Sequence, residues 1–244
     1  MEIKGAVALV TGANGGLGTA FVRGLLKAGA KHVYAAARDP GALSGLASEF
    51  DDRITTVRLD INDPAQAAGA ASQCSDLSLL VNNAGANLYA GVLADNAIDA
   101  ARTEIETNFF GTLNMCRTFA PVLAGNGGGG IINILSIAGI GSFPMMGTYS
   151  ASKAAQLSLT QSVRADLKGQ GTRVYAVLPA AIDTPLTANY EGPKDPPEGV
   201  VADTLAGVMK DEAYIWPVSA AHFRDVVGTG GWDLADQLAA FSEQ

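Results

Sequence analysis

The sequence is poor in charged residues, in cysteine and in histidine. Charged residues make up 16% of the 244 residues and hydrophobic residues 48%, a balance that indicates a large buried core and excludes an intrinsically disordered chain. Cys74 and Cys116 are too few for a disulfide framework, so we interpret both as small packed residues. We predict no metal site.

A long hydrophobic run and an excess of positive charge are also absent. The most apolar stretch, 131–146, is interrupted by Gly139, Gly141 and Pro144, which argues against a membrane span. The first residues lead directly into a predicted strand, and no signal peptide is visible. A net charge of −8 disfavours non-specific binding to nucleic acid. We therefore expect a cytoplasmic protein that binds neither nucleic acid nor membranes.

Short apolar runs alternate with longer segments of helical period along the whole chain. The predicted strands are 6–10, 33–36, 55–59, 77–81, 131–135, 173–178 and 213–217, and the predicted helices are 16–28, 40–49, 64–74, 98–123, 148–168 and 200–209. Strands that alternate with helices and are apolar throughout predict a parallel sheet with helices on both faces. With right-handed crossovers this is an α/β, Rossmann-type doubly wound sheet of about seven strands. We predict a single domain over residues 1–244.

A glycine-rich turn follows the first predicted strand. It reads Thr11-Gly12-Ala13-Asn14-Gly15-Gly16-Leu17-Gly18 and leads into a helical pattern. Such a turn lets the backbone approach a pyrophosphate, and the helix N-terminus adds N–H donors and a partial positive charge. The spacing is Gly-x-x-x-Gly-x-Gly, which differs from the Gly-x-Gly-x-x-Gly of other dinucleotide folds. The alternative is a turn that only allows the helix to pack on the sheet.

Tyr149 and Lys153 lie four residues apart in a predicted helix and therefore share one face. A tyrosine ordinarily ionises near pKa 10, and a neighbouring cation brings that pKa toward a value useful for acid–base chemistry. Ser136 follows the apolar run 131–135, where its hydroxyl can bond a substrate oxygen that Tyr149 protonates or deprotonates. The alternative is an ordinary helix-surface pattern.

In this order, the motifs resemble those of the classical short-chain dehydrogenases/reductases. The family's Thr-Gly-x-x-x-Gly-x-Gly stands at Thr11–Gly18, its Asn-Asn-Ala-Gly at Asn82–Gly85, its helix asparagine at Asn108, its serine at Ser136 and its Tyr-x-x-x-Lys at Tyr149 and Lys153. The resemblance extends from about Ala6 to Thr184. For Asn82 and Asn83 we also consider a structural interpretation, in which their side chains tie neighbouring strands together.

The resemblance implies a role for each catalytic residue. Tyr149 would be the general acid in carbonyl reduction and the base in alcohol oxidation, and Ser136 would stabilise charge on the substrate oxygen. Lys153 would lower the pKa of Tyr149 and bind the nicotinamide ribose, while Asn108 would hold a water that links Lys153 to solvent. The implied cofactor-binding residues are Gly12, Asn14, Gly15, Gly16, Leu17, Gly18, Arg38, Asp60, Ile61, Asn83, Ala84, Gly85, Tyr149, Lys153, Pro179, Ile182 and Thr184.

Residues after the second predicted strand indicate which dinucleotide is bound. NAD-preferring relatives place an acidic residue where Ala37 stands, whereas the guanidinium of Arg38 suits a 2′-phosphate. We therefore predict NADP(H), with Arg38 as a solvated surface charge paired with Asp39 as the alternative. Asp39 is also placed to cap the next helix. Asp60 has two open interpretations, a contact to adenine and a cap for the helix near Pro64.

Four residues are predicted to contact the substrate: Phe143, Met145, Leu186 and Tyr190. They are apolar, and no cluster of Arg or Lys accompanies them, so we expect a hydrophobic ketone or aldehyde; core packing is the alternative for Phe143 and Met145. The segment 184–199 contains four prolines and two glycines counted from Pro185. We predict that it forms no continuous helix and acts as a mobile lid, with an ordered surface loop as the alternative; its part 191–199 is predicted to be a loop throughout.

Together these features predict an NADPH-dependent oxidoreductase that reversibly reduces a hydrophobic ketone or aldehyde to an alcohol. A nucleotide-sugar epimerase would need a larger C-terminal domain than the residues after Leu178 provide. A non-catalytic dinucleotide-binding regulator or scaffold would be expected to have a damaged catalytic set. The predicted helices 98–123 and 148–168 resemble those that pair subunits in the family, which implies a homodimer or homotetramer. Near its end, the chain has an amphipathic segment at 232–241.

Overall fold

Seven parallel strands form the centre of the computed structural model, which describes residues 1–227. The amphipathic segment predicted at 232–241 lies outside the described residues. The strands are β1 (Val7–Thr11), β2 (His32–Ala37), β3 (Ile54–Arg58), β4 (Leu79–Asn82), β5 (Gly129–Ile134), β6 (Thr172–Val177) and β7 (Tyr214–Ile215). Each predicted strand is confirmed to within a few residues at its ends.

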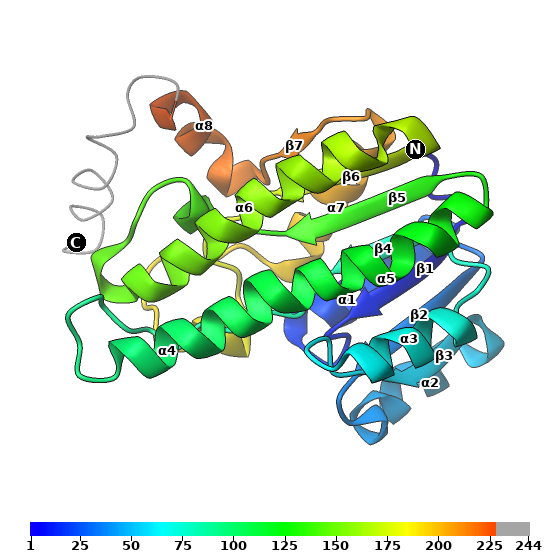
Figure 1. The fold of residues 1–244 in the computed structure, drawn as a ribbon, viewed down its shortest axis with the longest axis horizontal. Helices are drawn as coiled ribbons and strands as arrows, with labels where there is room; N and C mark the ends of the chain where they lie inside the picture. The colour runs from blue at the N-terminus through cyan, green and yellow to red at the C-terminus, as the bar shows by residue number, and fades with distance from the viewer. Residues whose placement is uncertain (228–244) are drawn as a thin grey trace.

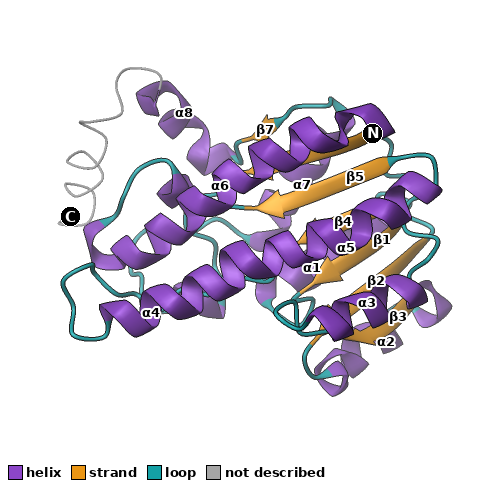
Figure 2. Ribbon diagram, in the orientation of Figure 1, coloured by secondary structure: helices purple, strands orange, loops and turns teal. Residues whose placement is uncertain are grey.

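Helices cover both faces of the sheet, as Figures 1 and 2 show. They are α1 (Gly16–Lys27), α2 (Ser44–Glu49), α3 (Pro64–Gln73), α4 (Ala97–Glu104), α5 (Thr112–Gly125), α6 (Gly147–Leu167), α7 (Pro197–Met209) and α8 (Ala221–Val227). Side chains that alternate along β1 enter two different cores: Ala8 and Val10 pack with Phe21 of α1, and Leu9 packs with Phe119 of α5. This alternation is the period-two pattern of a strand covered on both faces.

The strand order is β3-β2-β1-β4-β5-β6-β7. The chain moves outward from β1 to β3 and then returns to the other side of β1 at β4, so the order reverses between β1 and β4. In doubly wound sheets ligands bind at such a reversal, beyond the carboxyl ends of the strands. The predicted Rossmann-type fold is confirmed, and it places the glycine turn after β1 at this reversal.

Buried amides tie the central strands together. Asn82 Nδ2 donates to Asn133 Oδ1 at 2.8 Å, and Asn133 Nδ2 donates to Thr160 Oγ1 at 3.0 Å, which joins β4 and β5 to α6. Asn83 Nδ2 donates to the Thr11 carbonyl at 2.9 Å and so joins β4 to β1. The structural interpretation of Asn82 and Asn83 is therefore confirmed.

The predicted helix 98–123 has the right extent but is not a uniform α-helix. A π-helical segment, Ile105–Gly111, separates α4 from α5 and contains Asn108. π-Helical turns are rare and occur frequently at functional sites. None of the helices in residues 1–227 is long and apolar enough to cross a membrane.

One prediction about helix starts is wrong, one of the two interpretations of Asp60 is excluded, and one prediction is confirmed. Helix α7 begins at Pro197, inside the predicted loop 191–199, because a proline in the first helical turn loses no intrahelical hydrogen bond. Asp60 does not cap α3; Asp63 does, by accepting from the backbone N–H groups of Ala65 and Gln66. As predicted, Asp39 caps the short 3-10 helix that precedes α2.

Candidate active site

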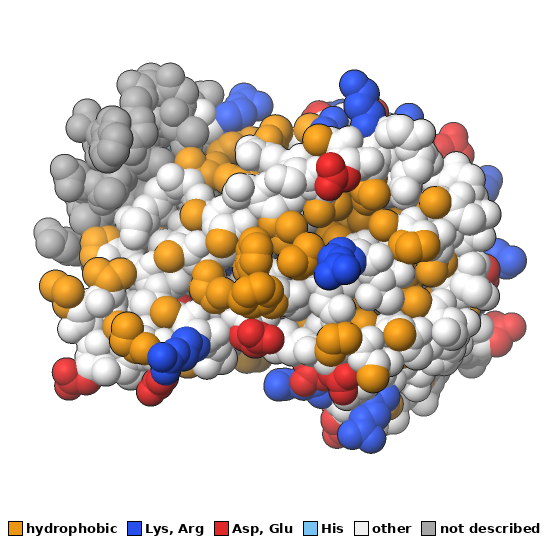
Figure 3. Space-filling model, viewed as in Figure 1, with side chains coloured by type: hydrophobic (Ala, Val, Ile, Leu, Met, Phe, Trp, Pro, Cys, Tyr) orange, Lys and Arg blue, Asp and Glu red, His pale blue; other side chains and the backbone are white. Residues whose placement is uncertain are grey.

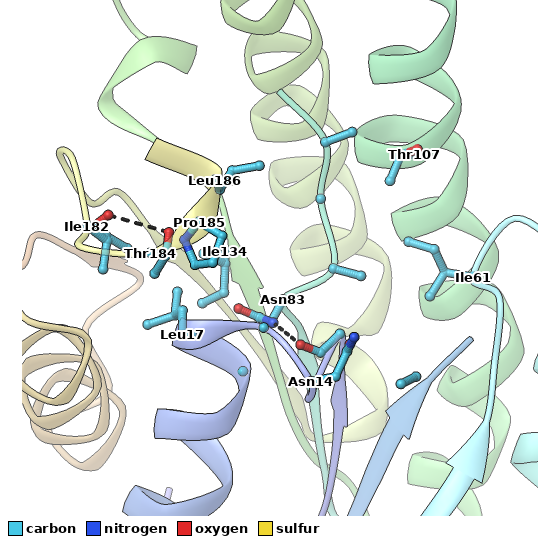
Figure 4. Close-up of a pocket in the computed structure, with 18 of the residues that line it drawn as sticks. Asn14, Leu17, Ile61, Asn83, Thr107, Ile134, Ile182, Thr184, Pro185 and Leu186 are labelled. Carbon is cyan, nitrogen blue, oxygen red and sulfur yellow. Dashed lines mark hydrogen bonds between the residues drawn. The ribbon is translucent and has the colours of Figure 1, made fainter. Parts of the chain in front are cut away.

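A cleft of about 670 Å³ opens at the carboxyl ends of the central strands. Figure 4 shows side chains from several elements around it: Leu17 from α1, Ile61 after β3, Asn83 after β4, Thr107 from the π-helical segment and Ile182 after β6. All the predicted cofactor-binding residues line it. The fold therefore brings together residues that are spread over most of the chain.

Three glycines of the turn at one end of the cleft, Gly12, Gly16 and Gly18, leave little or no room for a side chain. Gly12 has φ of +63°, a conformation that favours glycine. A Cβ on Gly18 would collide with the carbonyl oxygen of Gly12, and one on Gly16 would lie 2.9 Å from Thr184 Cγ2. Gly15, the N-cap of α1, makes no side-chain cap bond, so the first N–H groups of the helix are left for a ligand. The turn therefore fits the pyrophosphate of a dinucleotide.

Arg38 lines the cleft beside Ala37 and is exposed. Among the described residues it forms no ion pair with Asp39. The Asp39 carboxylate instead accepts the Gly41 N–H at 2.9 Å. The guanidinium is thus available to a phosphate group at this end of the cleft.

Ser136, Tyr149 and Lys153 lie together and are buried. Lys153 Nζ is 5.7 Å from the centroid of the Tyr149 ring, as expected for residues one helical turn apart. The same ammonium donates to the Ile134 carbonyl at 2.9 Å and to Gln156 Oε1 at 2.8 Å. Sequence reasoning missed Gln156, although its position three residues after Lys153 in the helix was a usable signal.

Burial controls the acid–base properties of this group. It raises the pKa of Tyr149, and the nearby Ser136 hydroxyl only partly opposes that shift. Burial also lowers the pKa of Lys153 to about 7. The shift at Tyr149 is opposite to the one expected from Lys153, because removing the phenolate from water is the largest contribution. In this structure the phenol is therefore the favoured form.

Asn108 is fully buried and does not line the cleft. Its Oδ1 accepts the Ala86 N–H at 2.9 Å, and its Nδ2 donates to the Ala86 carbonyl at 2.9 Å and to Ser152 Oγ at 2.8 Å. These bonds hold the chain after β4 against α6. Asn108 Oδ1 and Lys153 Nζ both lie near Gly85, 3.1 and 3.7 Å from the Cβ that a larger residue would place there. A role for Asn108 in holding a water stays a prediction.

Only one of the four predicted substrate residues reaches the cleft. Leu186 lines it, whereas Phe143, Met145 and Tyr190 do not. Met145 belongs to a short 3-10 helix, Pro144–Met146, that leaves its side chain 44% exposed. Phe143 and Met145 are close to Tyr149 in sequence, but they are not part of the wall of the cleft. Sequence reasoning missed several lining residues, namely Leu59, Asn62, Thr103, Thr107, Ile134, Leu135, Pro185 and Thr187.

Asp195 ties the segment 184–199 to the residues just before it and to Ser219. The Asp195 N–H donates to the Ala181 carbonyl and its carbonyl accepts the Asp183 N–H, both at 2.8 Å. The Ser219 hydroxyl donates to the Asp195 carboxylate. Before α7 the segment forms only a short 3-10 helix, Pro185–Thr187, so the absence of a continuous helix is confirmed there. Its mobility and its role as a lid stay predictions.

Taken together, the doubly wound sheet, the glycine turn and the buried Ser136, Tyr149 and Lys153 define an oxidoreductase site for a nicotinamide dinucleotide. No group of three or more potential metal ligands occurs in the part of the chain that the structure describes. Residues 6–195 match the family of short chain dehydrogenases. The chain therefore belongs to this family, whose members are NAD(P)-dependent oxidoreductases acting on CH–OH or C=O groups.

Relatives of known sequence agree with this assignment. The chain is 36% identical over 191 residues to the 2-(R)-hydroxypropyl-CoM dehydrogenase of Xanthobacter autotrophicus, with 74% of this chain and 76% of that protein covered. It is 32% identical over 217 residues to dehydrogenase/reductase SDR family member 7B of Bos taurus. That match covers 84% of this chain and 66% of the bovine protein, so the chain spans just under two thirds of that relative.

Solved structures show the same fold over nearly the whole chain. A short-chain dehydrogenase from Burkholderia cenocepacia in complex with NADP is 40% identical, with a TM-score of 0.92 and coverage of 98% of this chain and 99% of that one. A family member from Burkholderia phymatum in complex with NAD is 26% identical, with a TM-score of 0.85 and coverage of 97% and 96%. The neighbours therefore include complexes with both dinucleotides.

Burial of Lys153 predicts a pH-dependent stability of the cofactor-free protein. Its pKa is about 7 in the folded protein, below its ordinary value of 10.5. The unfolded chain therefore binds more protons between these values, and the free energy of unfolding rises with pH across the window. Relative to Lys153→Met, the wild type should gain about 2 kcal/mol between pH 7 and pH 9.

Urea unfolding at pH 7, 8 and 9 measures this difference. Lys168→Met, at an exposed position just after the C-terminal end of the same helix, is the control and should follow the wild type. Parallel pH profiles for the wild type and Lys153→Met would show that Lys153 keeps its charge when buried.

Proposed function

We propose that the protein is an NADPH-dependent reductase that converts a hydrophobic ketone or aldehyde to an alcohol, reversibly. The observation that carries this proposal is the buried group of Ser136, Tyr149 and Lys153 at one side of a cleft that has Arg38 near its other end. When bound, the nicotinamide supplies the hydride. Residues of this chain bind and orient the substrate and transfer the proton.

Tyr149 is suited to donate a proton to the substrate oxygen. Because burial raises its pKa, the phenol holds its proton at neutral pH and can act as a general acid in the reductive direction. The Ser136 hydroxyl accepts the Ala138 N–H at 3.1 Å and lies beside Tyr149, so it can donate its proton to the same substrate oxygen. Lys153 is held by Ile134 and Gln156 within reach of the Tyr149 ring.

Arg38 supports NADP(H) over NAD(H). An exposed guanidinium at the cleft, next to the neutral Ala37, matches the charge and donor geometry of a 2′-phosphate. The acidic neighbour Asp39 is engaged as a helix cap. The NADP complex of the Burkholderia cenocepacia relative is consistent with this choice.

The substrate is proposed to be uncharged. Among the residues that line the cleft, Arg38 and Lys153 are the only cations, and Lys153 lies next to Tyr149 with its hydrogen bonds to Ile134 and Gln156 inside the protein. Neither is placed to bind an anionic group of the substrate without leaving its proposed role. A non-catalytic dinucleotide-binding protein remains the alternative, but no observation favours it, because the catalytic set is complete.

The Tyr149→Phe variant tests the acid role. It removes the proton donor and little else, so kcat should fall at least about 100-fold. The Kd for NADPH, measured by fluorescence titration, should stay within about twofold because the ring remains. Tyr34→Phe, at a tyrosine that bonds Asp76 away from the cleft, is the control and should keep wild-type turnover. Near wild-type kcat in Tyr149→Phe would contradict the assignment.

The Arg38→Asp variant tests the choice of cofactor. Losing the guanidinium and adding a negative charge should raise the KM for NADPH by about 10- to 100-fold, since a charge-assisted pair with phosphate is replaced by repulsion. The KM for NADH should change far less and provides the internal control. Equal effects on both cofactors would show that Arg38 does not contact the 2′-phosphate.

We also propose a homodimer or homotetramer formed through the face of α4, α5 and α6. Hydrophobic side chains gather over this face in Figure 3, and Ile98 and Phe110 are 66% and 49% exposed. Light scattering at micromolar concentration should give at least twice the 24.9 kDa of one chain. Phe110→Glu should reduce that mass while leaving the circular dichroism spectrum unchanged. A monomer mass for the wild type would rule the proposal out.

A further inference from the structure

Two acceptors hold the amino group of Lys153 beside the reacting group. The Ile134 carbonyl accepts one hydrogen bond from Lys153 Nζ at 2.9 Å, and Gln156 Oε1 accepts another at 2.8 Å. The first acceptor is a backbone atom of β5, so its presence does not depend on which side chain stands there. The second is a side chain on α6, three residues after the lysine. Gln156 therefore gives the lysine an acceptor that this particular sequence supplies.

The residues around Gln156 fix the orientation of its amide. Gln156 Nε2 donates to Thr112 Oγ1 at 2.8 Å, and the Thr112 hydroxyl donates to the Asn108 carbonyl at 2.8 Å. Because its proton is used by Asn108, the Thr112 hydroxyl accepts from Gln156 and does not donate to it. The amide oxygen must then face Lys153, whose ammonium has donors and no acceptor. This chain of hydrogen bonds joins α6 to α5, which lie side by side in Figure 1.

Gln156 lies inside the core and outside the cleft. It is 0% exposed, and Thr112 is 1% exposed. Neither residue lines the cleft, whereas Lys153 does. The Gln156 carbonyl is also engaged, since it accepts the Thr160 hydroxyl at 2.7 Å. Gln156 is therefore placed to affect bound molecules through Lys153, by a hydrogen bond that water does not weaken.

Uncharged groups surround Lys153 on most sides. Among the described residues, Lys153 forms no ion pair. On its own helix it faces Tyr149, whose ring centroid lies 5.7 Å from Nζ. Buried Glu104 on α4 and half-buried Tyr89 after β4 act through their charges on Tyr149. Other charged residues on the elements packed against α6 are exposed: Asp99, Arg102, Glu106, Arg117 and Arg173. The Gln156 oxygen is thus a polar side-chain contact that favours the charge on Lys153.

We propose that Gln156 is a positioning residue, which holds Lys153 beside Tyr149 and favours the charged form of the lysine. This inference rests on the proposed reductase function, in which Tyr149 gives its proton to the substrate oxygen. The phenolate that remains on Tyr149 is stabilised by a neighbouring ammonium. Without the amide oxygen, Lys153 keeps the Ile134 carbonyl but loses part of the stabilisation of its charge, so it gives up its proton at a lower pH.

The stability of the cofactor-free protein reports the charge of Lys153 without any substrate. Its free energy of unfolding begins to rise with pH near the pKa of Lys153 in the folded protein, which is about 7. Gln156→Met removes the acceptor at similar length. Loss of this charge-assisted hydrogen bond should move the onset of the rise down by about one pH unit. Gln156→Glu keeps an acceptor and adds a negative charge, so it should move the onset up by about one unit or more.

Urea unfolding between about pH 5 and pH 9 measures these onsets. Thr160→Val is the matched control, because it removes a buried hydroxyl that bonds the backbone of Gln156 and leaves the bond to Lys153 in place. This control should lower the free energy of unfolding without moving the onset. Opposite shifts in Gln156→Met and Gln156→Glu are a result that loss of packing alone would not produce.

Turnover relates the same shifts to the reaction. The substrate is the ketone that the wild type reduces fastest with NADPH among cyclohexanone, acetophenone and 2-butanone. Its kcat should fall as pH rises through the range in which Lys153 loses its proton, because the phenolate of Tyr149 is then less stabilised. The midpoint of that fall should move down in Gln156→Met and up in Gln156→Glu. On the falling limb, a downward shift of one unit lowers kcat about tenfold.

The outcomes separate this inference from the proposed function. Equal onsets in the wild type, Gln156→Met and Gln156→Glu would overturn the inference, because the amide would then have no effect on Lys153. The same shift in Thr160→Val would overturn it too, since packing and not the acceptor would be the cause. Shifted onsets with an unmoved kcat midpoint would exclude a positioning role in the reaction. If the wild type reduced none of the three ketones, the proposed function would fail, while the unfolding profiles would still decide whether Gln156 acts on Lys153.

Discussion

The hydrogen bond from Lys153 Nζ to the Ile134 carbonyl ties α6 to the sheet beside the active site, and the position of the lysine next to Tyr149 depends on it. The bond joins the N-terminal half of α6 to the last residue of β5. Gln156 continues the contact by accepting from Lys153 and donating to Thr112 at 2.8 Å, which adds α5 to the same network. Because buried polar groups must be paired, the arrangement has few alternatives. This hydrogen-bond network holds Tyr149 at the carboxyl edge of the sheet, the same edge that carries the glycine turn after β1.

Burial of Tyr149 and Lys153 also determines their acid–base chemistry. The same low-polarity surroundings raise the pKa of Tyr149 and lower that of Lys153, so each residue gives up its charge more readily than it would in water. A neutral phenol is an acid ready to protonate a carbonyl oxygen. A lysine placed here costs stability near neutral pH, which is the trade-off expected where function requires a polar group inside a core. The protonation states of the active site and the stability of the fold are thus linked through one buried pair.

The loops at the carboxyl edge of the sheet fall into two groups, one suited to the cofactor and one suited to the substrate. The turns after β1, β2 and β3 form the end of the cleft that suits a dinucleotide, and they are short and close to the strands. The longer connections after β4 and β6 are held by side chains from elsewhere, Glu104 for the first and Ser219 for the second. In both, tertiary hydrogen bonds impose conformations that the local sequence would not adopt alone. Variation in substrate preference within a common fold is expected to arise in such loops.

The amino-acid sequence by itself determined the features that depend on local pattern. The apolar runs defined the seven strands, the spacing of Gly12, Gly16 and Gly18 defined the phosphate turn, and the interval between Tyr149 and Lys153 placed them on one helical face. Only the tertiary structure decided what depends on surroundings. It set the direction of the pKa shift at Tyr149, because desolvation is a property of the packed core. It also kept Phe143 and Met145 out of the cleft, inserted the π-helical segment around Asn108 and imposed positive φ on Tyr89. Each of these results from contacts between residues far apart in sequence, which no local pattern contains.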